Sequence, residues 1–412
     1  MHFLRKTVFI ALASLLPVAG FADASVSQEA LERATALLKS TPLIDGHNDL
    51  PWVIHEETDG DVDAFQLQAR NDFDTDIPRL REGMVGAQFW SVWIPGETPR
   101  ASTMSLQQQQ IDVARRIIET HPDVFELAST ADDIERIFAQ GKIASLLGME
   151  GGYALNNSLV PLQMYFTRGV RYMTLTHNVS TDWADAALGE QRHGGLTEFG
   201  EQVVREMNRL GMMVDIAHTS PATMHQVLDV SRAPLIWSHA AAKALVDHPR
   251  NVPDDVLERL DENGGIVMVT FIPSFLSQAV WDMEEKLWAT DAALDTVREF
   301  RDLWLTYDAE FGAVRATIDD VIRHIEHIRD TAGIDHVGIG SDYWGMPDMP
   351  LGLEDVSGFP HLFAALIERG WSDEDLRKLA GENMLRVMRD VEETASEARE
   401  IRPIRIATEP KD

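Results

Sequence analysis

The stretch LIDGHND, residues 43–49, is a short apolar run that ends abruptly in an imidazole and a carboxylate. Four later stretches end in the same way. They are SLLGMEGG (145–152), MMVDIAHTS (212–220), PLIWSHAA (234–241) and VGIGSDYWG (337–345). The side chains that the five stretches deliver are His47 with Asp49, then Glu150, His218, His239 and Asp342. An ordered series of imidazoles and carboxylates at the ends of apolar runs is typical of a two-metal hydrolase site.

Eight short apolar runs, each bounded by turn residues, predict eight β-strands. The runs are LIDGH, VGAQFWSVWI, IASLLGM, VRYMTLTH, MMVDIAH, APLIWSH, GIVMVTF and HVGIGSD. Amphipathic helical patterns lie between many of them, at residues 106–121, 197–211, 221–230, 253–264 and 316–333. Alternating strands and helices indicate a parallel sheet, and runs without two-residue alternation indicate strands covered on both faces. The sequence therefore predicts an α/β fold, a single (β/α)8 TIM barrel, with an N-terminal helix at residues 27–39 packed outside it.

In such a barrel the catalytic groups lie at the C-terminal ends of the strands, which is where each candidate ligand falls. Two long excursions, residues 56–77 and 273–315, follow the first and seventh predicted strands and should rise over that face. They are either lids over the active site or ordinary surface insertions, and the sequence leaves both interpretations open.

The N-terminus has the pattern of an export signal. A basic head, MHFLRK, precedes an apolar run of about 15 residues, which is too short to span a bilayer. We expect residues 1–24 to be a cleaved signal peptide, with Ala22 as a competing cleavage position, and residues 25–412 to form the hydrolase domain. The chain has no cysteine and a formal net charge of −31, which exclude structural disulfides and argue against nucleic-acid partners. A periplasmic or secreted protein fits these features.

The candidate ligands divide into two sets around one carboxylate. His47 and Asp49 lie two residues apart at a strand end, so both side chains can point to one place. Glu150 precedes two glycines, which allow a sharp turn, and it can bridge two metals. His218 and His239 end consecutive strands and can complete the second site. We expect a water or hydroxide between the two metals, and ligands of these types suit zinc, with manganese, iron and cobalt as alternatives.

Other histidines fall outside this set. His324 and His327 lie three residues apart in the middle of a predicted helix, away from the strand ends, and we expect a structural or surface role for both. His193 lies in the loop after the fourth predicted strand, where it either faces the substrate or stabilises a turn.

Several motifs in order resemble the membrane (renal) dipeptidase family of zinc hydrolases, within the amidohydrolase-like superfamily. They cover roughly residues 43–390 and read DGHNDLPW, GMEGG, LTHN, DIAHTS, SHA, HPRNVPD, GIGSDYWG and LAGENMLRVM. The resemblance implies two zinc ions per subunit, which share the bridging Glu150, and a peptide bond attacked by a metal-bridging hydroxide. The ligands that it implies are His47, Asp49, Glu150, His218 and His239.

The resemblance also implies roles for three further residues. His177, in LTHN, would stabilise the scissile carbonyl, and Arg250, in HPRN, would bind the substrate carboxylate. Asp342 would take a proton from the attacking water and return it to the leaving amine. On residue type alone, a surface salt bridge for Arg250 and direct metal ligation by Asp342 stay open as alternatives.

The chain departs from the animal members of this family in two ways. It has no cysteines, and its end, IRPIRIATEPKD, carries no apolar tail for a glycolipid anchor, so we expect a soluble member without a membrane anchor. Ile272 stands near the position where animal relatives carry a tyrosine, so this wall of the substrate pocket is altered and the preference for substrate side chains stays open. Relatives suggest a homodimer.

These features predict a zinc-dependent dipeptidase that hydrolyses L-Xaa-L-Xaa and L-Xaa-D-Xaa dipeptides. One alternative is another amidohydrolase-like enzyme, such as an N-acyl-amino-acid deacylase or a lactonase. A second alternative is a periplasmic binding protein that has kept the barrel and lost turnover.

Overall fold

The protein is a closed parallel β-barrel surrounded by helices, as the sequence predicts. The computed structural model describes residues 26–288, 306, 314–346 and 348–400. Within them the strands form one sheet in the order β2-β1-β9-β8-β7-β6-β5-β4-β3, and a further pairing of β2 with β4 closes the ring. The strands are β1 (Leu43–Asn48), β2 (Val85–Ser91), β3 (Phe125–Leu127), β4 (Ile143–Glu150), β5 (Val170–Thr174), β6 (Met213–Asp215), β7 (Leu235–Ala240), β8 (Ile266–Val269) and β9 (Val337–Ile339). Each pairing is parallel, and β3 joins only the start of β4, which leaves eight strands in the barrel, a TIM barrel.

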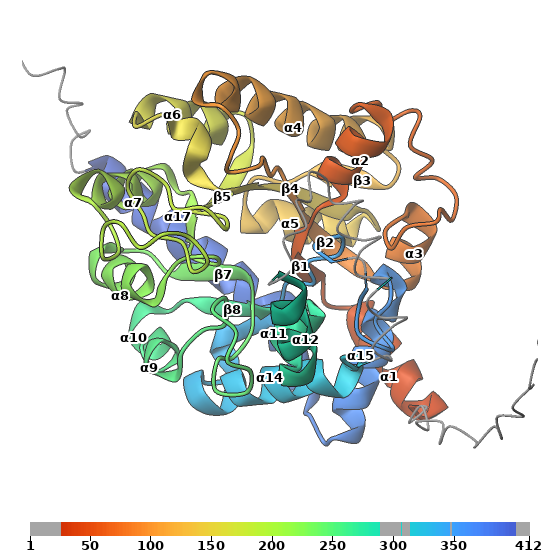
Figure 1. Ribbon diagram of the computed structural model, residues 1–412. Coiled ribbons are helices and arrows are strands. Elements are labelled where there is room, and N and C mark those ends of the chain that lie inside the picture. The colour runs from red at the N-terminus through yellow and green to blue at the C-terminus, as the bar shows by residue number, and fades with distance from the viewer. Residues whose placement is uncertain (1–25, 289–305, 307–313, 347, 401–412) are drawn as a thin grey trace, which may run out of the picture.

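Helices cover the outside of the barrel in a ring (Figure 1). The α-helices are α1 (Gln28–Leu38), α2 (Leu50–Thr58), α3 (Ile77–Glu82), α4 (Arg100–Thr120), α5 (Ala131–Ala139), α6 (Leu159–Thr167), α7 (Glu198–Leu210), α8 (Pro221–Val230), α9 (Asp254–Leu257), α10 (Leu260–Asn263), α11 (Pro273–Leu276), α12 (Gln278–Trp288), α14 (Ile318–Ala332), α15 (Phe359–Glu368), α16 (Asp373–Arg377) and α17 (Asn383–Glu400). The described residues also form four short helical segments of other types, namely η1 (Gly152–Leu155), η2 (Ile334–His336), η3 (Val356–Gly358) and η4 (Lys378–Glu382).

The predicted elements are present, with differences of detail that have local causes. The N-terminal helix is α1, which packs on α15 outside the barrel, as expected. The link between β2 and β4 holds β3 and α5 in addition to the predicted helix, and the segment predicted as one helix at residues 253–264 is two short helices. Strand β3 pairs only with the start of β4 and is only partly buried, with Glu126 at its centre, so it lacks the pattern of a strand covered on both faces.

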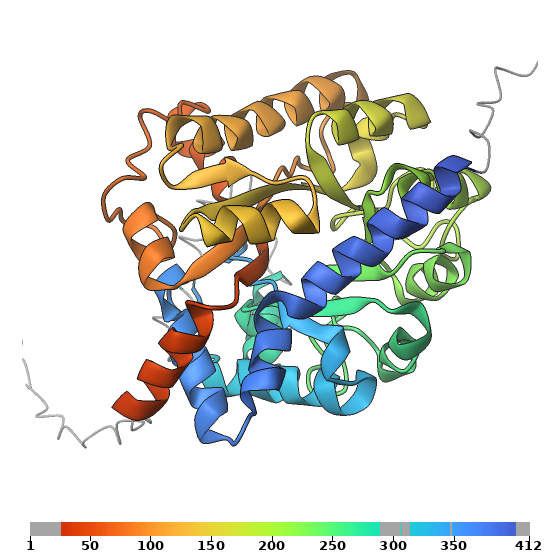
Figure 2. The same cartoon turned by 180° about the vertical axis from the view of Figure 1, so that it is seen from behind.

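The N-terminal end of the barrel is closed by apolar packing. Helix α17 crosses this end diagonally (Figure 2). Its apolar side chains join those inside the barrel in one buried cluster, which includes Ile44, Phe89, Leu385, Met388 and Val391. The preceding turn, η4, lies so close to the start of β1 that a Cβ on Gly381 would be 2.3 Å from the Pro42 carbonyl oxygen. The close approach requires glycine at this position.

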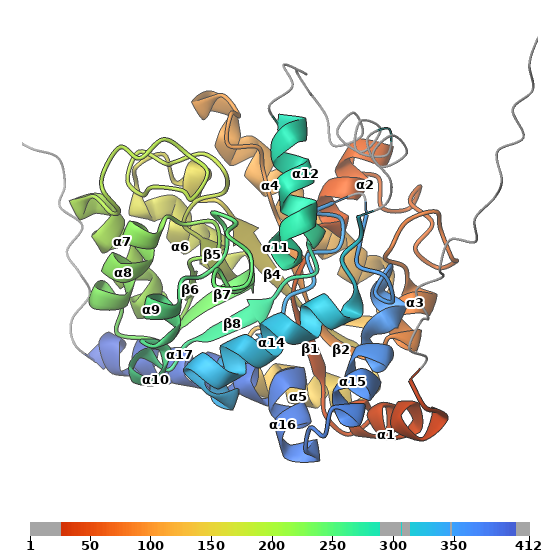
Figure 3. The ribbon, with the colours of Figure 1, turned by 60° about the horizontal axis from the view of Figure 1, so that its bottom comes forward.

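The opposite, C-terminal end carries the long connections. Helices α11 and α12 follow β8 and stand on this side of the barrel (Figure 3). The excursion at residues 56–77 is an irregular segment between α2 and α3, and Val62, Phe65 and Leu67 bury their side chains in the core. Part of the excursion at residues 273–315, like the expected signal peptide, lies outside the described residues. In the described part of the chain, no helix combines the length and apolarity needed to cross a bilayer.

Candidate metal centre and active site

The C-terminal strand ends bring the predicted ligands into one cluster. His47 lies near the end of β1, Glu150 ends β4, and His239 lies near the end of β7, while His218 and Asp342 follow β6 and β9. All five are at least 94% buried. His218 and Asp342 have φ values of 64° and 63°, in the left-handed region that non-glycine residues rarely adopt. Strained backbone of this kind is concentrated at functional sites, where surrounding structure holds it in place.

Glu150 lies at the centre of the cluster, with its two oxygens turned to different partners. Oε1 is 2.9 Å from Nε2 of His218 and 3.4 Å from Nε2 of His239. Oε2 is 3.4 Å from Nε2 of His47. The two histidine nitrogens on the Oε1 side are themselves 2.8 Å apart. This arrangement matches a carboxylate that bridges two metal positions.

Hydrogen bonds on the far side of each imidazole fix which nitrogen faces the cluster. The hydroxyl of Tyr172 donates to the Gly46 carbonyl at 3.1 Å and lies 2.9 Å from Nδ1 of His47, so it accepts the Nδ1 proton. Nδ1 of His218 is 3.0 Å from the amide oxygen of Asn178, which can only accept.

Nδ1 of His239 is 2.9 Å from the hydroxyl of Ser238, which donates in turn to Asp215 at 2.6 Å. Each of the three histidines therefore carries a proton on Nδ1 and turns Nε2 to the cluster. This leaves Nε2 as the nitrogen that can bind a metal, and the orienting partner on the other nitrogen is typical of metal sites.

Two further carboxylates complete the donor set. Oδ1 of Asp49 is 3.4 Å and Oδ1 of Asp342 is 3.8 Å from Nε2 of His47. Among the described residues, three groups of three side chains have donor atoms that lie within 4.8 Å of one another inside each group. The groups are His47 with Asp49 and Glu150, Glu150 with His218 and His239, and His47 with His239 and Asp342. Imidazole and carboxylate donors without thiolate fit zinc and other first-row divalent metals.

The cluster separates the pKa values of its carboxyl groups. Burial works against ionisation of Glu150, but the neighbouring His47 and His177 outweigh it and hold the pKa of Glu150 well below its usual value. Burial raises the pKa of Asp342 well above its usual value, and the charges of Asp49 and Glu150 act in the same direction. Carboxyl groups whose environments push their pKa values apart are typical of acid and base roles in catalysis.

Arg250 is buried beside this cluster with hydrogen-bonding capacity to spare. Its side chain is 3% exposed, and its Nε and Nη2 have no acceptor among the described residues. Burial lowers the pKa of its guanidinium to about 10, so the group stays protonated at neutral pH. The guanidinium carbon lies 5.0 Å from the centre of the Phe275 ring, and the Arg250 backbone N–H donates to Nδ1 of His248. A buried cation with free N–H donors suits a planar anion such as a carboxylate.

His177 lies against the same cluster. Its ring is 4.2 Å from that of His218 and 5.3 Å from that of Trp93, which contacts Trp52 edge-on at 4.6 Å. Its backbone N–H donates to the hydroxyl of Tyr153 at 2.9 Å. Burial lowers the pKa of the imidazole, so the ring is neutral at neutral pH and retains one N–H donor and one acceptor.

Sequence reasoning missed the residues that orient the ligands. Tyr172, Asn178 and Ser238 each hold Nδ1 of one histidine, and the aspartates at positions 45 and 215 are buried beneath them. One signal was available for the aspartates. Each is a charged residue inside a run predicted to be a strand covered on both faces, as in LIDGH and MMVDIAH, and such a residue is buried only with compensating donors.

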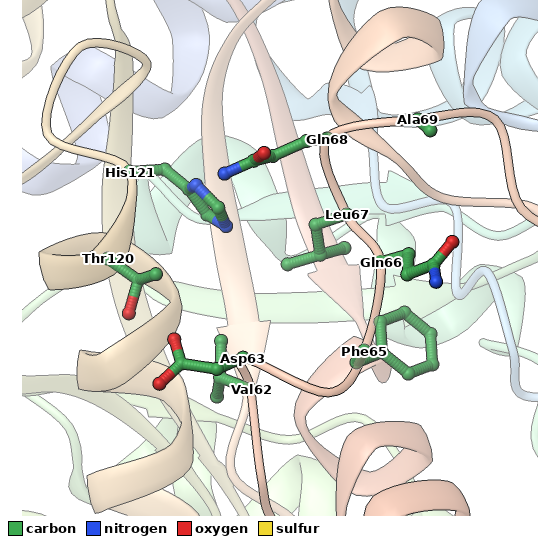
Figure 4. Close-up of a pocket in the computed structure, with 9 residues that line it drawn as sticks. All are labelled: Val62, Asp63, Phe65, Gln66, Leu67, Gln68, Ala69, Thr120 and His121. Atoms are coloured by element: carbon green, nitrogen blue, oxygen red, sulfur yellow. The ribbon is translucent and has the colours of Figure 1, made fainter.

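The remaining histidines and a surface cavity lie apart from the cluster. Nδ1 of His324 accepts from the Ala242 backbone N–H, and Nε2 of His327 pairs with Asp254 at 2.8 Å. Nε2 of His193 lies 3.2 Å from the Thr181 carbonyl oxygen within its own loop. A cavity of about 270 Å³ has a lining that includes none of the cluster residues. Figure 4 shows the side chains around it. It is lined by Val62, Asp63, Phe65, Gln66, Leu67, Gln68, Ala69, Thr120 and His121.

Comparison with known families identifies the group to which this arrangement belongs. The model of the family described as membrane dipeptidase, peptidase family M19, matches residues 31–402. The chain belongs to the membrane dipeptidase family. It is accordingly a metallopeptidase, a hydrolase that acts on dipeptides.

Solved structures share the fold of this membrane dipeptidase over nearly their whole length. The probable dipeptidase PvdM from Pseudomonas aeruginosa is 24% identical with a TM-score of 0.77, over 89% of this chain and 99% of that chain. A metallopeptidase described as dipeptidase AC is 26% identical with a TM-score of 0.70, over 85% and 98%. A metallopeptidase from Rhodobacter sphaeroides, liganded with a phosphinate mimic of the dipeptide L-Ala-D-Ala, is 24% identical with a TM-score of 0.70, over 85% and 99%.

Proposed function

We propose that the protein is a zinc-dependent dipeptidase that cleaves L-Xaa-L-Xaa and L-Xaa-D-Xaa dipeptides. The observation that carries this proposal is the convergence of the Nε2 atoms of three histidines on the two oxygens of Glu150. One zinc ion would be held by His47, Asp49 and Glu150, and the other by Glu150, His218 and His239. The inclusion of a C-terminal D-residue is supported by the relative that is liganded with a mimic of L-Ala-D-Ala.

Zinc ions bound there would lower the pKa of water toward neutrality and polarise a carbonyl oxygen. The chain's own residues would then position the substrate. Arg250 would bind the C-terminal carboxylate through the N–H groups that have no acceptor in the described protein. Because this charge lies beside the metal ligands, only a very short peptide would place its scissile bond there while its free carboxylate reaches the guanidinium.

Two residues would assist the bond cleavage itself. The neutral imidazole of His177 would donate its N–H to the carbonyl oxygen as negative charge develops on it. Asp342, whose pKa is raised by burial, would accept the proton of the attacking water and pass it to the leaving nitrogen. The same carboxylate lies within the third group of donor atoms, so direct metal ligation is the alternative role for it.

The test is the release of amino acids from paired substrates by purified protein. Free L,L- and L,D-dipeptides are compared with their N-acylated counterparts, before and after chelation and after zinc is added back. We expect cleavage of the free dipeptides that is lost on chelation and restored by zinc. Activity on acylated substrates alone would assign a deacylase, and zinc-loaded protein that binds dipeptides without cleaving them would assign a binding protein.

We further propose that residues 1–24 direct export and are removed, because they combine a basic head with a short apolar run and small residues at Ala22 and Ala24. Sequencing the N-terminus of protein recovered from the periplasm would test this. The expected first residue is Ser25, or Asp23 for the competing position, and an intact Met1 would contradict the proposal.

A further inference from the structure

Two buried aspartates lie beneath the ligand cluster and are not among its donor groups. Asp45 on β1 and Asp215 on β6 are both 0% exposed. Each accepts hydrogen bonds at both carboxylate oxygens from a single serine, which lies on the neighbouring strand β7 for Asp215 and just after the neighbouring strand β9 for Asp45. Ser341 donates its backbone N–H at 2.7 Å and its hydroxyl at 2.6 Å to Asp45, and Ser238 donates the same two groups to Asp215 at 2.9 and 2.6 Å.

The remaining partners of the two aspartates also correspond. Asp45 accepts from the backbone N–H of His47 and the side-chain amide of Gln88 on β2. Asp215 accepts from the backbone N–H of Ala217 and the hydroxyl of Thr174 on β5. Four donors around each carboxylate offset part of the cost of burying it, and no acceptor lies among them. Both groups are therefore built to be hydrogen-bond acceptors.

We call each aspartate together with its serine a clamp. The strand register places the two clamps in equivalent positions. Asp45 pairs with Ile339 across β1 and β9, and its serine follows that partner by two residues. Asp215 pairs with Ile236 across β6 and β7, and its serine again follows by two. In both clamps the residue after the serine belongs to the cluster, and it is Asp342 in one and His239 in the other.

One contact distinguishes the clamps. The hydroxyl of Ser238 lies 2.9 Å from Nδ1 of His239, whereas Ser341 makes its second contact to the carbonyl oxygen of His47 at 3.3 Å. Because Asp215 accepts the proton of Ser238, the serine oxygen can only accept from His239. The Asp215 clamp therefore determines which nitrogen of a ligand carries the proton, and the Asp45 clamp does not.

We propose that Asp215, acting through Ser238, is a positioning residue that holds His239 with Nε2 unprotonated for the second metal, and that Asp45 with Ser341 is its purely mechanical counterpart. The inference rests on the proposed metal centre. It concerns which residues set up one of the two metal positions, and it can be tested without a substrate.

The sharpest variants are Asp215→Asn and its matched control Asp45→Asn. An amide of the same shape donates where the carboxylate oxygen accepted, so the Ser238 hydroxyl is free to donate to Nδ1 of His239 instead. The imidazole proton then moves to Nε2, the nitrogen that faces the metal. In Asp45→Asn the amide likewise donates to the Ser341 hydroxyl, but that hydroxyl faces the carbonyl oxygen of His47 and not an imidazole nitrogen. Ser238→Ala and Ser341→Ala form a second matched pair, in which the hydroxyl is simply removed.

The measurement is zinc content together with competition against a chelator of known affinity, with unfolding of the metal-free proteins in denaturant as a measure of folding. We expect Asp215→Asn and Ser238→Ala to lose affinity at one of two zinc positions by about 10- to 100-fold, as for other outer partners of metal ligands. We expect Asp45→Asn and Ser341→Ala to keep both affinities, although the metal-free proteins of each matched pair lose similar stability.

Equal loss of zinc in both members of a pair, or loss in neither, would overturn the inference and leave the metal centre intact. If the alanine variants fail to fold, the asparagine pair decides by the same criterion, because it preserves the shape of the side chain. Wild-type protein that binds no zinc would overturn the proposed centre itself, and the inference with it.

Discussion

The two ends of the barrel are packed with side chains of opposite polarity. At the N-terminal end, α17 lays Leu385, Met388 and Val391 against apolar residues inside the barrel. At the C-terminal end, the side chains that meet are imidazoles and carboxylates around Glu150. All eight barrel strands run in the same direction, so their C-terminal ends, where barrels of this kind carry their catalytic groups, all lie at one end of the barrel. The other end is left to stabilise the fold.

The difference is also one of strain. The C-terminal end of the barrel, called the rim below, holds His218 and Asp342 in left-handed backbone and buries the charge of Arg250, all of which cost folding free energy. The N-terminal end, called the base below, contains the close packing that offsets such costs. Substitutions at the rim should therefore reduce activity more than stability, and substitutions at the base should reduce stability more than activity.

The largest effect is expected at the centre of the rim. Glu150→Gln removes the charge of the group that faces both metal positions, and we expect activity to fall by more than about 10²-fold, since even outer partners of metal ligands are worth 10- to 100-fold. The metal-free variant should lose some stability at neutral pH, because the neighbours that hold the pKa of Glu150 well below its usual value stabilise its ionised form in the folded protein. Dipeptide turnover and denaturant unfolding of the same preparations measure both. Wild-type turnover in this variant would show that the rim cluster is not the catalytic centre.

Next comes Arg250→Ala, which should lower kcat/KM for dipeptides by about 10²-fold or more, or ~3 kcal/mol, the usual cost of truncating one partner of a buried charge pair. Dipeptide amides provide the control, because they lack the carboxylate that the guanidinium would bind. The wild type and the variant should cleave the amides at similarly low rates. An equal loss on acids and amides would instead indicate that Arg250 supports the structure of the rim.

At the base, Leu385→Ala tests the other side of the comparison. Its side chain is 4% exposed within the apolar cluster, so truncation should lower the free energy of unfolding by about 2 to 5 kcal/mol. Zinc content and kcat/KM per folded molecule should remain at wild-type values. A matched loss of activity in the folded fraction would mean that the two ends are coupled, contrary to the separation described above.

The last expected effect is a pH dependence of stability that arises at the edge of the rim. Asp74 accepts from the Trp344 backbone N–H at 3.0 Å, and burial raises the pKa of its carboxyl from 3.8 to about 7. Between these values the folded protein binds a proton that the unfolded chain has released, so stability falls as pH rises through that window. Asp74→Asn lacks this proton. The variant should gain stability relative to the wild type as the pH is raised, and a constant difference across denaturant titrations at several pH values would contradict the assignment.

The sequence predicted the barrel and the members of the rim cluster because short stretches of sequence indicate both. Apolar runs give the strands, and the residue type at each run's end gives the candidate ligand, as at His47 and Glu150. What it could not show are pairings across strands. That Ser341 meets Asp45, or that Tyr172 holds His47, depends on register between segments about 300 and 125 residues apart.

Two other features were equally hidden from local patterns. The motif LAGENMLRVM was recognised, but its position across the base follows from packing of α17 against the barrel as a whole. The left-handed backbone at His218 and Asp342 is uncommon for any residue other than glycine, so only the surrounding structure could reveal it.

The most direct test is anomalous diffraction at the zinc absorption edge from crystals of the zinc-loaded protein. Two peaks are predicted, one among His47, Asp49 and Glu150 and the other among Glu150, His218 and His239. Absence of both peaks, or peaks confined to other parts of the molecule, would contradict the assignment of the barrel rim as a two-metal dipeptidase site.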